Sequence, residues 1–171
     1  MFEKWGKVGY NVIATTGRSY LRAEKDAEMF IGTYHNSIDS KNRMIVPSKL
    51  RDDLGGKCIL TTGLDKCLYI YSLEDWTAQM EKLAGLPDSD EEVRSFIRRF
   101  SGNAAECEFD KAGRIVIPGL LKAYAEIDKN LVTVGAIKKI EVWAEEVYES
   151  VAGEEKMKGV SFDKALGSYS Y

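Results

Sequence analysis

Residues 39–47 read DSKNRMIVP, and residues 110–118 read DKAGRIVIP. Both stretches run in the same order: Asp, three residues, Arg, three apolar residues and Pro. The second stretch follows the first at a distance of 110 − 39 = 71 residues. A stretch of this length that recurs once predicts that the fold contains two copies of one unit.

The similarity continues beyond the two prolines. SKLRDDLGG follows Pro47 and GLLKAYAEI follows Pro118, and each segment is typical of a short helix. Proline is tolerated at a first helical position, because its missing N–H would have no partner there. Gly55 and Gly56 favour the end of the first of these helices.

Two β-rich runs come next, KCILTTGLDKCLYIY in the first copy and NLVTVGAIKKIEVW in the second. They align when Gly63 is placed opposite Gly135, which predicts a hairpin with a glycine turn in each copy. An acidic helix start follows each run, and Ser72 with Asp75 predicts a capping box in the first copy. Each unit is therefore expected to be strand, tight turn, strand, short helix, hairpin and helix, with pseudo-twofold symmetry between the units.

The segment between the copies predicts two amphipathic helices, separated by a Gly-Leu-Pro-Asp-Ser break at 85–89. Ser89 and Glu92 predict a capping box at the start of the second helix. The large apolar residues recur at helical spacing, which favours core packing over a cofactor pocket. They are Trp76, Met80 and Leu83 in the first helix, and Val93, Phe96, Ile97 and Phe100 in the second, beside a solvated face with Arg94, Arg98 and Arg99.

The composition is that of an ordinary globular protein, with 44% hydrophobic and 30% charged residues. No apolar run approaches the roughly 20 residues of a membrane span, and residues 1–28 lack the apolar block of a signal peptide. We therefore expect a cytoplasmic protein. The formal net charge of -3 argues against wholesale wrapping of nucleic acid, but it leaves room for a local basic patch.

Metal binding is not expected from the cysteines. Cys58, Cys67 and Cys107 are scattered and odd in number, and His35 is the one histidine in the chain. A structural zinc site needs about four ligands, so buried thiols are the favoured interpretation.

Catalysis is not expected either. Asp39 and Asp110 could be imagined as paired carboxylates, and His35 and Asp65 as partners of a nucleophilic Cys67. Neither arrangement has supporting spacing, and the chain has no glycine-rich phosphate loop and no nucleophile elbow.

The repeated stretch has the chemistry of a tight turn. Asn42 and Gly113 occupy equivalent positions, and both residue types tolerate positive φ. The Asp of each copy can accept hydrogen bonds from the backbone of its own turn. The Arg can pair with that Asp or point outwards, so a purely structural role for the motif stays open.

The charges near the turns favour a second role. Both turns lean basic in an acidic protein, and Lys and Arg can approach a phosphate backbone or read guanine. The basic residues are Lys41, Arg43, Lys49 and Arg51 in the first copy, and Lys111, Arg114 and Lys122 in the second.

The chain resembles the MraZ family over approximately residues 29–150. The resemblance rests on the segments MFIGTYHNSIDSKNRMIVPSKLRDDL, CLYIYSLEDW and SGNAAECEFDKAGRIVIPGLL. It implies an α+β fold, mainly β, in which two AbrB-like units form a pseudo-twofold swapped-hairpin β-barrel with amphipathic helices. It also implies a ring-shaped homo-oligomer.

The function that the resemblance implies is a transcriptional regulator, usually a repressor, that binds promoter repeats of the division and cell-wall gene cluster, its own operon included. The partners would be double-stranded DNA and further copies of the chain on the nucleoid, without a membrane, cofactor or metal. A non-catalytic oligomeric scaffold and an AbrB- or antitoxin-like regulator of another target stay open.

The resemblance ties DNA contact to Lys41 and Arg43, and Arg114 matches in the second copy. Lys49 and Arg51 complete the expected DNA-binding set. The expected structural turn residues are Asp39, Asn42, Asp110 and Gly113. The family usually has Gly where this chain has Asn42, which predicts a slightly stiffer turn.

The expected organisation has five parts. An atypical extension comes first and a tail last, and both disorder and docking on a neighbour stay open for these ends. The parts are the extension 1–28, the first repeat with its helix 29–84, the connection and second helix 85–106, the second repeat 107–152 and the tail 153–171.

Overall fold

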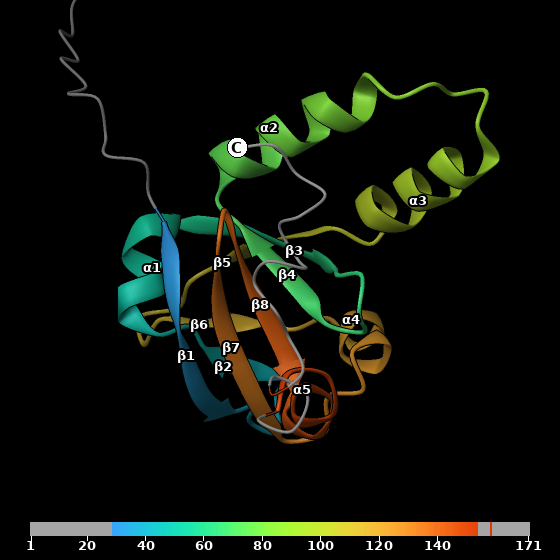
Figure 1. The fold of residues 1–171 in the computed structure, drawn as a ribbon. Coiled ribbons are helices and arrows are strands. Elements are labelled where there is room, and N and C mark those ends of the chain that lie inside the picture. Colours follow the sequence, from blue (N-terminus) through green and yellow to red (C-terminus); the bar gives the residue numbers. More distant parts are fainter. Residues whose placement is uncertain (1–28, 154–157, 159–171) are drawn as a thin grey trace, which may run out of the picture.

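The computed structural model describes residues 29–153 and residue 158. The expected extension 1–28 and nearly all of the expected tail lie outside the described residues. The described part has the element order expected from the sequence, strand, strand, helix, strand, strand, helix, with one further helix between the two copies (Figure 1). The limits of the two repeats remain a prediction.

In the described part of the chain each copy contributes four strands. They are β1 Phe30–Ser37, β2 Arg43–Ile45, β3 Lys57–Thr62 and β4 Leu68–Tyr71, then β5 Ala105–Glu108, β6 Arg114–Val116, β7 Asn130–Ile137 and β8 Lys139–Ala144. The helices are α1 Ser48–Leu54, α2 Leu73–Ala84, α3 Glu91–Gly102, α4 Gly119–Tyr124 and α5 Glu145–Ala152.

The two copies exchange strands. The six-stranded antiparallel sheet has the order β1-β7-β8-β4-β3-β5, so the first strand of each copy pairs with the hairpin of the other copy. Figure 1 shows β1 in blue beside β7 in orange. The pseudo-twofold axis relates β8 to β4, and it also relates β2 to β6, which pair as a separate two-stranded sheet.

The central strands are buried on both faces because each face has its own core. Alternate residues of β4 divide between the cores, with Leu68 and Ile70 on one side and Tyr69 and Tyr71 on the other. The first core lies beneath the β2–β6 pair, α1 and α4, and the second lies beneath α2 and α3. The β2–β6 pair and the α2–α3 arm therefore lie on opposite faces of the large sheet.

The expected closed barrel is not what the described strands form. They make a six-stranded and a two-stranded sheet, joined at one end by the single bridge between Ile38 and Met44. The fold is therefore a mixed α+β fold with a mainly antiparallel sheet. The strands β2 and β6 are three residues long, and they pair with each other as a separate sheet.

One expected glycine turn was placed wrongly. Gly63 does end β3 at its turn, but Gly135 lies inside β7, opposite Gly32 of β1. A Cβ at position 135 would lie 2.4 Å from the backbone nitrogen of Ile31. Gly135 is therefore needed where β1 approaches closely, and Ile137, at φ 63°, turns the chain into β8.

Helix starts were predicted with mixed success. Ser72 caps α2 as expected, because its hydroxyl accepts from the backbone N–H of Asp75 at 3.0 Å. The expected box of Ser89 and Glu92 is wrong: Asp90 caps α3 by accepting from the N–H groups of Glu92 and Val93. The N-cap of α3 is therefore Asp90, one residue further along the chain than the expected Ser89.

The two long helices pack through their aromatic stripe, as expected. The rings of Trp76 and Phe96 stack on Phe100 with centroids 5.4 and 5.3 Å away. Phe100 is buried, whereas Trp76 and Phe96 are half-buried. Much of the aromatic surface is therefore covered within one chain.

Candidate nucleic-acid interface

The first turn, residues 39–43, is closed by its Asp. Oδ1 of Asp39 accepts from the backbone N–H groups of Lys41 and Arg43 at 2.9 and 3.0 Å. Oδ2 of Asp39 accepts from Nε of Arg43 at 2.8 Å and lies 2.7 Å from its Nη2. Asn42 has φ 56°, the left-handed conformation expected at this position. In this geometry Asp39 accepts hydrogen bonds from the backbone of its own turn, and Arg43 pairs with that Asp.

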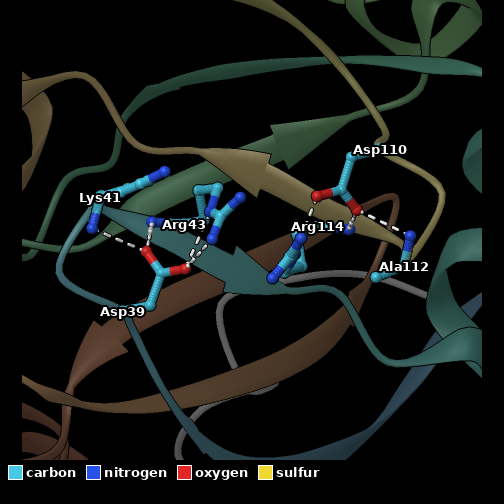
Figure 2. A network of polar contacts seen from close by, with 6 residues as sticks. All are labelled: Asp39, Lys41, Arg43, Asp110, Ala112 and Arg114. Carbon is cyan, nitrogen blue, oxygen red and sulfur yellow. Dashed lines mark hydrogen bonds and ion pairs between the residues drawn. The ribbon is translucent and has the colours of Figure 1, made fainter.

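The second turn repeats this geometry (Figure 2). Asp110 accepts from the backbone N–H groups of Ala112 and Arg114 at 2.8 and 3.0 Å, and from Nε of Arg114 at 2.8 Å. Gly113 has φ 74°. Both copies therefore use the motif in the same way, with the Arg folded back on its own Asp.

The two turns sit at opposite ends of one small unit, the β2–β6 ribbon, which comprises residues 43–45 and 114–116. The ribbon is antiparallel, so each turn enters it from a different end (Figure 2). Beyond the ribbon, the N–H of Val46 donates to the carbonyl of Gly113, and the N–H of Ile117 donates to that of Asn42. Each turn is thus hydrogen-bonded to the residue that follows the ribbon strand of the other copy.

Arg51 breaks the symmetry of the two turns. Its Nη1 donates to the carbonyl of Val46 at 3.4 Å, and an ideal Cβ built on Gly113 would lie 1.6 Å from this nitrogen. The position equivalent to Arg51 in the second copy is occupied by Lys122. Arg51 therefore supports the turn of the other copy, which the sequence did not reveal.

The Asp–Arg pairs are ionised and close to neutral overall. The hydrogen bond from the Arg43 guanidinium lowers the pKa of Asp39 to about 2, and the Arg114 backbone N–H leads the causes that lower the pKa of Asp110. Among contacts of the described residues, Nη1 of Arg43 has no hydrogen bond. Each Asp thus holds its Arg in one direction and leaves guanidinium N–H groups free to donate.

The lysines near the turns are solvent-exposed. Lys41, Lys49 and Lys111 are exposed, and in the described part of the chain none of them forms an ion pair. In Figure 2 the ammonium group of Lys41 points away from Asp39. Net positive charge at the turns therefore comes from lysine, whereas the two motif arginines are largely neutralised.

Two residues on the outer face of the ribbon, Ile45 and Val116, were not among the site residues expected from the sequence. Met44 and Ile115 point into the core, so their neighbours point outwards. The alternation of RMI and RIV could have revealed this, because a half-buried strand shows one apolar face. Here the outer face is also partly apolar.

Other candidate chemistry is not assembled. Burial raises the pKa of the Cys67 thiol to about 12, which disfavours the nucleophilic thiolate. The imidazole of His35 does not pair with Asp65 or Cys67 among the contacts of the described residues. Its Nδ1 lies 3.2 Å from a carboxylate oxygen of Glu145. Among the described residues, no cluster of His, Cys, Asp and Glu could hold a metal ion. None of their helices has the length and apolar character needed to cross a bilayer.

The fold and the paired turns define a class: an α+β protein of two copies that exchange strands and meet at a ribbon with basic turns. Within that class, the chain belongs to the MraZ family. The family model of the MraZ protein, which is described as antitoxin-like, matches residues 29–99 and again residues 100–165.

Relatives match over most of the chain. Transcriptional regulator MraZ of Acetivibrio thermocellus is 48% identical over 138 residues, 81% of this chain and 96% of the relative. The protein of that name from Caldanaerobacter subterraneus is 44% identical over 136 residues, 80% of this chain and 93% of the relative. That of Clostridium beijerinckii is 49% identical over 118 residues, 69% of this chain and 83% of the relative.

Proposed function

We propose that the protein is a DNA-binding transcriptional regulator that contacts promoter DNA through the two turns of the β2–β6 ribbon. The observation that carries the proposal is the placement of two copies of one basic turn at the two ends of a single ribbon. The family membership and the names of the relatives favour a regulator over an enzyme.

Within this proposal the lysines and the arginines contact different parts of the DNA. Lys41, Lys49 and Lys111 contact phosphates, because none of them forms an ion pair with another residue that the structure describes. Arg43 and Arg114 donate their free N–H groups to base edges, held in position by Asp39 and Asp110. Arg51 contributes less directly, because its guanidinium supports the second turn.

The finer biology is also part of the proposal and follows the family resemblance. The protein represses its own operon by binding repeats in the promoter of the division and cell-wall genes, and it is associated with the nucleoid. The exchange of β1 and β5 between the copies supports the AbrB-like swapped-hairpin interpretation.

A ring-shaped homo-oligomer would place several ribbons on repeated DNA boxes and so raise the apparent affinity. The exposed residues Met29, Ile31 and Ile137, at the β1–β7 end of the sheet, are apolar surface that a neighbouring copy could cover. The aromatic residues of α2 and α3 support the ring less than expected, since they pack within one chain.

The test is binding to a duplex of the DNA upstream of the protein's own gene, compared with scrambled DNA over a salt series. Each lysine that contacts a phosphate contributes about 0.9 to the slope of log K against log salt concentration. The double variant Lys41→Ala, Lys111→Ala should therefore bind more weakly and with a shallower slope, without loss of a folded-state ion pair.

The matched control removes two charges from the opposite face. Lys82 and Arg98 lie on α2 and α3, and both are exposed. Lys82→Ala, Arg98→Ala should bind like the wild type, and light scattering should give both variants the wild-type mass. Equal loss in the two variants would reject the ribbon as the interface, and absence of binding at low salt would favour a scaffold.

A further inference from the structure

The outer face of the β2–β6 ribbon is a small array of four side chains. Arg43 lies directly opposite Val116, and Ile45 lies directly opposite Arg114. Directly opposed residues point to the same side of a sheet, with Cβ atoms about 4.5–5.5 Å apart. The two arginines therefore occupy one diagonal, and the two aliphatic residues occupy the other.

The aliphatic diagonal is open to solvent. Ile45 is 51% exposed and Val116 is 54% exposed. The inward residues of the same strands, Met44 and Ile115, already supply the ribbon's contribution to the core. Folding of the described chain thus leaves Ile45 and Val116 free, at equivalent positions of the two copies.

The surroundings of this diagonal indicate what could cover it. Lys41 flanks the ribbon in one turn and Lys111 in the other, so cationic groups stand at both ends of an apolar centre. A second apolar protein surface would have to bury or pair these lysines. A DNA duplex would not, because its phosphates border a groove whose floor presents base edges.

The dimensions also suit DNA. The strands of the ribbon are about 4.8 Å apart, and the major groove, about 12 Å wide, admits a two-stranded ribbon. In that groove the one apolar group on the base edges is the C5-methyl group of thymine. An aliphatic side chain beside a guanidinium therefore matches a thymine next to a base that accepts hydrogen bonds.

We propose that Ile45 and Val116 read thymine by packing against its C5-methyl group when the ribbon enters the major groove. The proposal rests on the proposed function. It makes the two residues determinants of sequence specificity, placed one in each half of a pseudo-symmetric contact. Because Ile is larger than Val, the two halves make unequal contacts.

The experiment uses the full chain and two versions of the same duplex, the DNA upstream of its own gene. One version contains thymidine, and the other contains deoxyuridine in its place, which removes the methyl groups and keeps every hydrogen-bonding atom. The affinity of the wild type for the deoxyuridine duplex should be about fourfold lower for each methyl group that the protein contacts, because the burial of one such group changes the affinity by about this factor. In the double variant Ile45→Ala, Val116→Ala, the difference in affinity between the two duplexes should be smaller. The slope of log K against log salt concentration should be that of the wild type.

The control variant is Leu86→Ala, in the connection between α2 and α3 on the other face of the sheet. It should keep the full difference between the duplexes. Equal wild-type affinity for both duplexes overturns the proposal and leaves the proposed function standing, as does an undiminished difference in the double variant. A change of mass in light scattering would assign the diagonal to contact between copies and overturn it too. Absence of binding to either duplex removes both proposals.

Discussion

At the residue scale, the repeated motif shows how one short sequence can serve a turn twice. Asp39 and Asp110 each accept hydrogen bonds from the backbone N–H groups two and four residues further on in their own turns. Each also accepts one from Nε of the Arg in its turn. This local chemistry was predictable, since Asp, Asn and Gly have known preferences within four residues of chain. The contact between Arg51 and Gly113 was not, because it joins different copies.

Gly113→Ala should destabilise the protein by about 1–2 kcal/mol through the left-handed backbone conformation alone, and the contact with Arg51 should add to this loss. The new methyl group would also displace Nη1 of Arg51 from its place over the turn. Chemical denaturation of the variant measures the loss. Asn42→Gly is the matched control, and it should change stability little, because position 42 has the same left-handed backbone conformation, which glycine adopts without strain.

A double-mutant cycle separates strain from crowding. In an Arg51→Ala background, Gly113→Ala should cost less, since the nitrogen that occupies the Cβ position is gone. The same cost in both backgrounds would show that backbone strain alone explains the effect and that Arg51 does not support the turn.

At the element scale, β-rich runs, Pro and Gly positions and helical spacing predicted the order of helices and strands, but they did not assign the element ends equally well. The aromatic spacing of α2 and α3 was sufficient, because the apolar stripes of both helices face the second core. Asp90 was missed because two capping residues stand next to each other before α3. Gly135 was missed because a glycine within a strand looks like a turn until the approaching strand is known.

Phe100 is expected to anchor the α2–α3 arm to the sheet. Its ring packs against Tyr71, Trp76 and Phe96, and its carbonyl accepts a hydrogen bond from the buried hydroxyl of Thr61 at 2.5 Å. Phe100→Ala should therefore cost about 3–5 kcal/mol in chemical denaturation.

Leu86→Ala, in the exposed connection of the same arm, should change stability by less than about 0.5 kcal/mol. Loss of only about 1 kcal/mol in Phe100→Ala would mean that the arm is held elsewhere. Retained arm order in the variant, measured by hydrogen exchange of α3, would point the same way.

At the scale of the whole molecule, the repeat itself indicated duplication, whereas interleaved copies were implied only by the family resemblance. Period-two burial identifies a strand and its inner face, yet it carries no information on which strand lies beside it. In the described chain, the pairs that join the two copies are β1–β7, β2–β6, β3–β5 and β4–β8. Among the named strands that the structure describes, the pairs within a copy are the hairpins β3–β4 and β7–β8. Neither copy can therefore complete its sheet alone, although each carries a full set of elements.

This exchange predicts that the chain survives a cut between its copies. A protease site placed in the exposed connection 85–90 opens the chain without touching a strand. After cleavage the two pieces should remain together in native size-exclusion chromatography, because four strand pairs and the shared first core hold them. Unfolding of the cut protein should become dependent on protein concentration, since the pieces then separate on unfolding. The uncut variant is the control and should unfold independently of concentration. Pieces that separate in native buffer and each unfold cooperatively would show two self-sufficient units, which the exchange of β1 and β5 does not permit.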